Sequence, residues 1–259
     1  MSINPGGPNG GSATQYFTGK FDGKSFTSFD TLTRWIDYGP DNYAGVTWSN
    51  TGSRKIFMGW MSNWDYAQKV PTNQWRSAMT LPRDLRIEKE NGKYLIASRP
   101  SPEFESVARD PGTFIKVLPG RPLRFALIPP HGRLVINADS VRSCSFVLSN
   151  DSGQNVIVGY DDSTKSYYIN RTASGKSDFE KTFTRIHTAP RLTNAREMKI
   201  TLIHDVSSVE LFADDGLTVM TAVFFPDVPF NMMQVKADKN FIGEEIRYAP
   251  VRSVYGKKK

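Results

Sequence analysis

Turn signals recur at short intervals along this chain of 259 residues, and they constrain its fold more than any other feature. Asp22-Gly23, Asn91-Gly92 and Asp215-Gly216 each separate two segments that alternate in polarity or are rich in strand-forming residues. Such pairs are typical of β-hairpins, because both turn positions favour a positive φ. Helical periodicity is nearly absent, apart from a short turn expected over residues 102–107. The sequence therefore predicts an all-β protein.

The composition is that of a folded globular protein. Hydrophobic residues make up 39% of the chain and aromatic residues 12%, which argues against disorder. The longest apolar runs, such as residues 125–128, are far shorter than a membrane span. The net charge of +7 includes the three lysines at 257–259, and the other basic residues are interspersed with acidic ones. No nucleic-acid-binding signature accompanies them, so neither nucleic acid nor a membrane is an expected partner.

Residues that form disulfides or hold metals are sparse. The single cysteine, Cys144, excludes an intrachain disulfide, and in the segment Ser143-Cys144-Ser145-Phe146-Val147-Leu148 we expect it to be a buried strand thiol. His131, His187 and His204 are far apart and lack metal-ligand spacing, so we expect satisfied structural histidines. We expect neither a bound metal nor a cofactor.

A domain boundary is expected near Arg99-Pro100-Ser101-Pro102, where two prolines interrupt the strand pattern. All five tryptophans precede it, at positions 35, 48, 60, 64 and 75. This asymmetry predicts two modules, residues 1–99 and residues 100–259. Tryptophan enrichment suits a sugar site, because indole faces stack on the apolar faces of sugar rings, although tryptophans also pack protein cores.

Several motifs follow one another along the chain in a fixed order. The first half holds segment 2–17, then Trp35-Ile36-Asp37-Tyr38-Gly39-Pro40-Asp41-Asn42-Tyr43-Ala44, Gly59-Trp60-Met61-Ser62-Asn63-Trp64 and segment 71–83. The second half adds Gly159-Tyr160-Asp161, Asp178-Phe179 and segment 207–216. Over nearly its whole length, the chain therefore resembles the sucrose- and fructan-cleaving glycoside hydrolases of family 32.

The resemblance implies a fold and a chemistry. The fold would be the last part of a five-bladed β-propeller (residues 1–99, the end of blade four and blade five) followed by a C-terminal β-sandwich (residues 100–259). The chemistry would be retaining hydrolysis of terminal β-fructofuranosides such as sucrose, inulin or levan, which uses two carboxylates about 5 Å apart. The expected partner is a fructose-containing oligo- or polysaccharide, and a homodimer through the sandwich is left open. The full-length parent is expected to be periplasmic or secreted.

The family's catalytic motifs are not matched. Its nucleophile lies in an Asn-Asp-Pro motif and its acid/base in a Glu-Cys motif, and neither string occurs here. Arg109-Asp110-Pro111 spells the family's stabiliser motif, but it follows the expected boundary, so we interpret it as a turn. We predict that this chain holds no catalytic residue, is inactive alone and is a piece of a longer enzyme. The alternative is a non-catalytic carbohydrate-binding or oligomerisation module.

Part of the family's sugar pocket is matched residue by residue. Asp37 and Asp41 are predicted to accept hydrogen bonds from fructose hydroxyls, since charge-assisted hydrogen bonds are the stronger kind. Turn capping is the alternative role for both carboxylates. Tyr43 and Asn63 are predicted to be polar contacts at the rim.

The stacking surface of the pocket is assigned to one tryptophan. Trp64 ends the motif that begins at Gly59, at the place where the family has a pocket indole, so we predict that it stacks on the sugar. Trp60, four residues earlier, is expected to fill the core of the blade.

Overall fold

The computed structural model describes residues 1–4, 6–108, 113–115, 123–126, 128–238 and 243–254. Among them, strands alternate with loops and two short 3₁₀ helices, η1 (Pro102–Ser106) and η2 (Asp214–Gly216). The all-β prediction is confirmed, and the short turn expected over residues 102–107 is η1. In the described part of the chain, no helix is long and apolar enough to cross a membrane.

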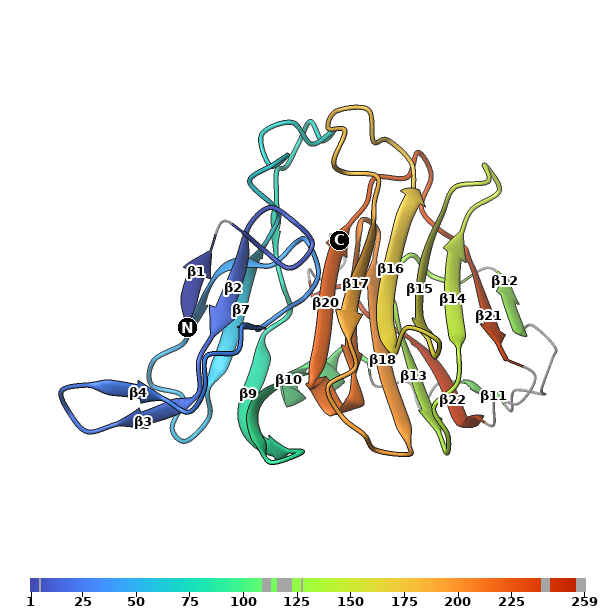
Figure 1. Cartoon of the computed structure of the whole chain (residues 1–259). Coiled ribbons are helices and arrows are strands. Elements are labelled where there is room, and N and C mark those ends of the chain that lie inside the picture. The colour runs from blue at the N-terminus through green and yellow to red at the C-terminus, as the bar shows by residue number, and fades with distance from the viewer. Residues whose placement is uncertain (5, 109–112, 116–122, 127, 239–242, 255–259) are drawn as a thin grey trace.

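Small antiparallel sheets build the first hundred residues, to the left in Figure 1. One has the order β1 (Ser2–Asn4), β2 (Ala13–Tyr16), β5 (Arg34–Trp35). Another has the order β10 (Lys93–Pro100), β9 (Arg83–Glu90), β7 (Ile56–Met61), β6 (Tyr43–Thr47), with β8 (Ala78–Met79) pairing to β7. The hairpin of β3 (Gly19–Phe21) and β4 (Phe26–Ser28) projects away from both (Figure 1).

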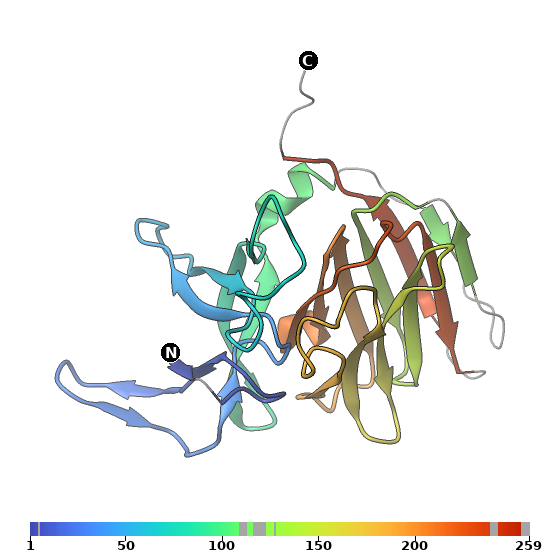
Figure 2. The same ribbon diagram turned by 90° about the horizontal axis from the view of Figure 1, so that it is seen from above.

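Two six-stranded antiparallel sheets face each other in the second part of the chain (Figure 2). The first has the order β11 (Thr113–Ile115), β22 (Gly243–Pro250), β13 (Gly132–Ala138), β18 (Met198–Asp205), β19 (Ser208–Ala213), β20 (Thr218–Val223). The second has the order β12 (Leu123–Ala126), β21 (Met232–Ala237), β14 (Cys144–Ser149), β15 (Asn155–Asp161), β16 (Ser166–Ala173), β17 (Ile186–Pro190).

The main core lies between these two sheets. In β13 and β14 every second residue is buried, because successive side chains of a strand point to opposite faces. Leu134 and Ile136 thus pack in one cluster with Phe146 and Leu148 of the other sheet. Each such side chain contributes about 1.5–3 kcal/mol by leaving water. Cys144 also lies in this cluster, which confirms the prediction of a buried strand thiol.

All three predicted hairpins are present, as β3–β4, β9–β10 and β19–β20. Asn91 and Gly92 have φ values of 50° and 78°, as their turn requires. The first hairpin differs, because only Gly23 of its predicted pair has a positive φ. The Asp22 carboxylate instead closes that loop by accepting hydrogen bonds from the backbone N–H groups of Lys24 and Ser25.

The two parts of the chain meet along the edge strand β20. The backbone N–H of Tyr38 donates to the Val219 carbonyl at 2.7 Å, and that of Asp41 donates to the Thr221 carbonyl at 3.1 Å. Segment 38–41 therefore covers an edge that would otherwise present unpaired backbone groups. The approach is close, since a Cβ on Gly39 would lie 2.1 Å from the Thr221 carbonyl oxygen.

Both faces of β20 are also covered, so all six of its residues are buried. Met220 and Ala222 point into the core between the sheets. On the other face, Val219 packs with Leu81 of the first part and with Phe104 of η1. The seam between the two parts is thus a packed and hydrogen-bonded interface.

Candidate functional site

Three aromatic rings form a cluster at one end of β6 and β7. Tyr43 of β6 pairs in register with Trp60 of β7, and their ring centroids are 6.4 Å apart. Trp64, just after β7, lies 5.1 Å from Trp60, measured between ring centroids. The Trp64 side chain is 60% exposed, although indole is among the most apolar side chains. We call Tyr43, Trp60 and Trp64 the aromatic cluster.

Trp60 connects the other two rings of this cluster. It is half-buried and its ring contacts both Tyr43 and Trp64, so the exposed indole of Trp64 rests on a partly buried ring. The two rim and stacking residues predicted from the sequence, Tyr43 and Trp64, are therefore brought together by the fold through a third aromatic ring.

Asn63 is buried and holds the backbone on either side of Trp64. Its Nδ2 donates to the Pro40 carbonyl at 2.8 Å, and its Oδ1 accepts hydrogen bonds from the N–H groups of Ser12 and Asp65. The Trp64 N–H donates to the Ser12 hydroxyl at 3.3 Å. The Asn63 amide, predicted as a rim contact, is thus engaged by protein groups on both its atoms.

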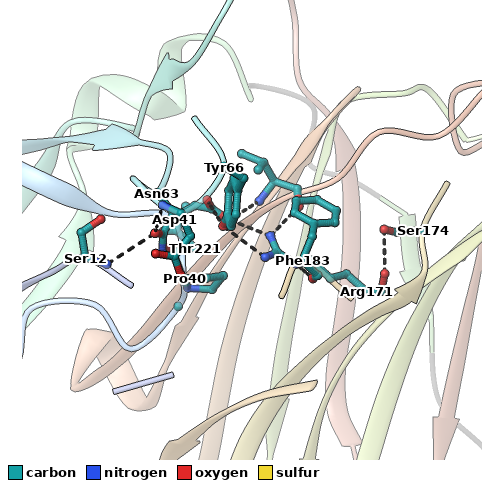
Figure 3. A network of polar contacts seen from close by, with 12 residues as sticks. Ser12, Pro40, Asp41, Asn63, Tyr66, Arg171, Ser174, Phe183 and Thr221 are labelled. Carbon is teal, nitrogen blue, oxygen red and sulfur yellow. Dashed lines mark hydrogen bonds and ion pairs between the residues drawn. The ribbon is translucent and has the colours of Figure 1, made fainter. Parts of the chain in front are cut away.

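The Asp41 carboxylate is fully buried on the side of this loop that faces the second part of the chain (Figure 3). Its Oδ1 accepts a hydrogen bond from the Tyr66 hydroxyl at 2.5 Å. Its Oδ2 accepts from Arg171 Nη1 and from the Val223 N–H, both at 2.9 Å. Burial raises the pKa of Asp41, while the charge of Arg171 and the hydrogen bond from Tyr66 oppose that rise.

The Asp37 carboxylate binds β20 in an equivalent way, at Thr221 instead of Val223. Its Oδ1 accepts hydrogen bonds from the N–H groups of Gly39 and Thr221, at 2.8 Å and 2.9 Å. Its Oδ2 accepts from the Thr221 hydroxyl at 2.6 Å and from Arg83 Nη1 at 2.8 Å. Arg83 is itself fully buried and donates through Nη2 to Glu210 of β19 at 2.5 Å.

The structure therefore separates the five predicted site residues into two groups. Tyr43 and Trp64 belong to the aromatic cluster, in which Trp64 is exposed and Tyr43 half-buried. Asp37, Asp41 and Asn63 are buried, and their polar atoms bind protein donors and acceptors. For the two aspartates, a capping role is present in the structure, but the groups they cap belong to β20 rather than to a local turn alone.

The sequence interpretation missed Arg83, Arg171 and Glu210, which bind these carboxylates. A signal was available, since Arg171 continues the inward-facing series of Tyr167 and Ile169 in β16. Glu210 likewise stands in an apolar run, between Val209 and Leu211. A charge at an inward-facing position predicts a buried partner of opposite charge, because an unpaired buried charge is very costly.

We expected the histidine side chains to be hydrogen-bonded within the protein, and this holds for His204 but not for His187. His204 Nε2 lies 3.2 Å from the Tyr248 hydroxyl. For His187 the expectation is wrong, because neither buried ring nitrogen has a hydrogen-bond partner among the described residues. Its inward position in β17 places the ring in packed surroundings beside the charges of Arg171 and Arg185. The motif Arg109-Asp110-Pro111 lies outside the described residues.

Comparison with known proteins assigns the class of protein, the glycosyl hydrolases. The model of the glycosyl hydrolases family 32 N-terminal domain matches residues 1–100, and that of the family 32 C-terminal domain matches residues 113–248. The chain belongs to glycosyl hydrolase family 32, as its sequence motifs had indicated.

Curated relatives cover the same stretch. A levanase of Bacillus subtilis is 32% identical over 271 residues, which span 99% of this chain and 40% of the levanase. An extracellular exo-inulinase of Aspergillus niger is 32% identical over 247 residues, which span 86% of this chain and 45% of that enzyme. The chain thus spans about half the length of the relatives it matches, or somewhat less.

Solved structures agree with this relationship. The exo-inulinase of Aspergillus awamori superposes with a TM-score of 0.86 at 25% identity, over 97% of this chain and 52% of that one. A fructofuranosidase of Schwanniomyces occidentalis complexed with fructosylnystose gives a TM-score of 0.85 at 26% identity, over 97% of this chain and 55% of that one.

Proposed function

We propose that this chain is the C-terminal part of a retaining glycoside hydrolase that cleaves terminal β-fructofuranosides in sucrose, inulin or levan. The family membership supports the chemistry, and the matched relatives include a levanase and exo-inulinases. Retaining hydrolysis requires a nucleophile and an acid/base carboxylate about 5 Å apart. Since relatives of this group are extracellular exo-inulinases, we also propose a secreted parent protein.

We propose the following division of the chain. Residues 1–99 would be the end of blade four and blade five of a five-bladed propeller, and residues 100–259 a β-sandwich. The antiparallel order β10-β9-β7-β6 supports a blade, and the two facing six-stranded sheets support the sandwich. We also propose that two copies of the chain can form a homodimer through the sandwich.

The observation that carries the site proposal is the exposed indole of Trp64, supported by Trp60 and held by a buried, hydrogen-bonded loop. We propose that Trp64 stacks on a fructosyl unit and that Tyr43 borders it. A sugar hydroxyl could reach Asp37, Asp41 or Asn63 only by displacing protein groups, so their direct contact with sugar stays a prediction and the aromatic cluster carries the proposal.

Titration of the chain with inulin-derived oligosaccharides, followed by tryptophan fluorescence and calorimetry, tests this assignment. Trp64→Ala is expected to abolish the signal, because the stacking face is lost. Trp48→Ala is the matched control, since Trp48 is also exposed but lies beyond Thr47, at the opposite end of β6 from Tyr43. Equal loss in both variants, or none in either, would overturn the assignment to Trp64.

We further propose that the isolated chain does not hydrolyse its sugar ligand. The reason is chemical, because neither an Asn-Asp-Pro nor a Glu-Cys motif is present in its 259 residues. Incubation with sucrose, inulin and levan should release no fructose above a protein-free blank. Fructose release that tracks the purified chain would sink this proposal, whereas sugar binding without release would support it.

A further inference from the structure

Arg171 reaches from the second part of the chain into the loop that carries Trp64 (Figure 3). It lies in β16, is fully buried and donates to four groups. Nη1 donates to Asp41 Oδ2 at 2.9 Å and to the Val223 carbonyl at 3.0 Å. Nε donates to the Phe183 carbonyl at 2.8 Å, and Nη2 to the Tyr66 hydroxyl at 3.1 Å. These bonds fix the plane of the guanidinium group.

Two aromatic rings add to this fixation. The Arg171 Cζ lies 3.8 Å from the ring centroid of Phe183 and 5.2 Å from that of Tyr66. The Tyr66 hydroxyl both donates to Asp41 and accepts from Arg171, so Asp41, Tyr66 and Arg171 form a closed triad. Arg171 therefore supplies the charge that keeps the fully buried Asp41 carboxylate paired.

Trp64 lies between the two anchored ends of a short loop. Before it, Asn63 is bound to Pro40 and Ser12. After it, the N–H of Tyr66 donates to the Asn63 carbonyl, and the Tyr66 side chain enters the triad. The indole itself is mostly exposed and contacts Trp60, so the direction in which it points depends on that ring and on these two ends.

We propose that Arg171 is a positioning residue for the sugar-facing surface: through Asp41 and Tyr66 it fixes the loop that presents Trp64. Arg171 does not touch the sugar on this proposal, which rests on the function proposed above. The second part of the chain thereby contributes to sugar binding without lining the site, and the effect is transmitted through one buried ion pair and one phenol hydroxyl.

The chain offers a matched control of the same chemistry. Arg191, Asp214 and Tyr167 form a second Arg–Asp–Tyr triad, with the Tyr167 hydroxyl 2.8 Å from Asp214 Oδ2 and Arg191 Nη2 3.1 Å from Asp214 Oδ1. It includes no residue of the Trp64 loop. Variants of this triad report the general cost of disturbing a buried ion pair in this protein.

The experiment uses the full chain with fluorine-labelled tryptophan, whose Trp64 resonance is assigned by Trp64→Phe. Arg171→Lys and Tyr66→Phe are expected to shift or broaden the Trp64 resonance and to weaken binding of inulin-derived oligosaccharides about tenfold, equivalent to about 1.4 kcal/mol. Arg191→Lys and Tyr167→Phe should leave both readings unchanged. Tyr66→Phe keeps the ring and removes only the hydroxyl, so it serves if Arg171→Lys fails to fold.

The outcomes separate this inference from the proposed function. A Trp64 resonance that is unchanged in Tyr66→Phe, or changed equally in Tyr167→Phe, would overturn the positioning role of Arg171. If the Trp64 resonance of the wild type does not change when the sugar is added, the stacking assignment is wrong. The resonance of the variants without sugar would still decide whether Arg171 positions the loop.

Discussion

Two fully buried arginines, Arg83 and Arg171, join the two parts of the chain at the scale of single residues. Each pairs with an aspartate of the first part and also binds groups of the second part. A buried ion pair is weak evidence for net stability, because removing both charges from water is costly. Breaking one is different, because the remaining charge is then left buried and unpaired.

Asp41→Asn should therefore destabilise the protein strongly. We expect a loss of about 3–5 kcal/mol in the free energy of unfolding, since Arg171 then keeps no charged partner among the described residues. Asp162→Asn is the control, because its ion pair with Lys165 is exposed and such pairs contribute less than about 1 kcal/mol. Urea denaturation of both variants measures the difference, and a similar small loss in both would contradict the prediction.

His187 makes the stability depend on pH in a defined direction. Burial, together with the charges of Arg171 and Arg185, lowers the pKa of His187 to about 3. An unfolded histidine titrates near 6.5, so between these values the unfolded chain binds a proton that the folded chain does not. Stability is therefore complete above about pH 6.5 and falls as the pH is lowered toward 3.

His187→Leu should reduce this acid sensitivity. Its ring nitrogens have no partner among the described residues, so an apolar replacement breaks no hydrogen bond there. Between pH 7 and pH 5 the wild type should lose about 2 kcal/mol more stability than the variant. Urea denaturation at the two pH values measures this, and parallel losses would show that His187 is not the group responsible.

At the scale of elements, the edge of β20 is closed partly by side chains. The Thr221 and Val223 N–H groups, which face outward from the sheet, donate to the carboxylates of Asp37 and Asp41. The outward carbonyls of Val219 and Thr221 accept hydrogen bonds from segment 38–41. An exposed edge invites pairing with other chains, so this arrangement also protects the protein from aggregation.

Gly39→Ala should open this edge. Its Cβ would lie 2.1 Å from the Thr221 carbonyl oxygen, so the segment must move away at a cost of about 1–3 kcal/mol. Gly153→Ala is the control. Its φ of 77° also makes alanine costly there, but an added Cβ would meet no heavy atom within 4 Å. Amide hydrogen exchange should accelerate at Thr221 and Val223 in Gly39→Ala only. Unchanged exchange there would contradict the edge-closing role of segment 38–41.

At the scale of the whole molecule, the seam couples the two parts. Buried ion pairs, backbone hydrogen bonds and packing of Val219 against Leu81 all cross it. Neither part can expose this surface without leaving charged and apolar groups in an unsuitable environment. We therefore expect the chain to unfold as one cooperative unit.

The chain carries its own reporters for this test. All five tryptophans lie in the first 75 residues, and the only cysteine, Cys144, is buried in β14 of the second part. Tryptophan fluorescence and thiol labelling of Cys144 should therefore show the same urea midpoint. A fluorescence transition at clearly lower urea than the labelling transition would show that the first part unfolds independently.

The strands and turns could be predicted because they depend on neighbours in sequence. The two-residue period of β13 and the Asn91-Gly92 turn follow from local backbone geometry. The family motifs around Gly59 can be recognised from the order of the residues alone. The aromatic cluster was also within reach, since Tyr43, Trp60 and Trp64 belong to two adjacent strands and the loop that follows them.

The sequence by itself thus determined the fold class and the family, and it singled out Trp64, which the structure shows to be exposed and which we propose stacks on the sugar. Only the tertiary structure decided where the two aspartates point. Asp41 and Arg171 are 130 residues apart in sequence, and Asp37 and Thr221 are 184 apart. No local pattern encodes such a pairing, because a carboxylate that binds a sugar and one that caps a distant strand have the same chemistry until packing brings one partner within hydrogen-bonding distance.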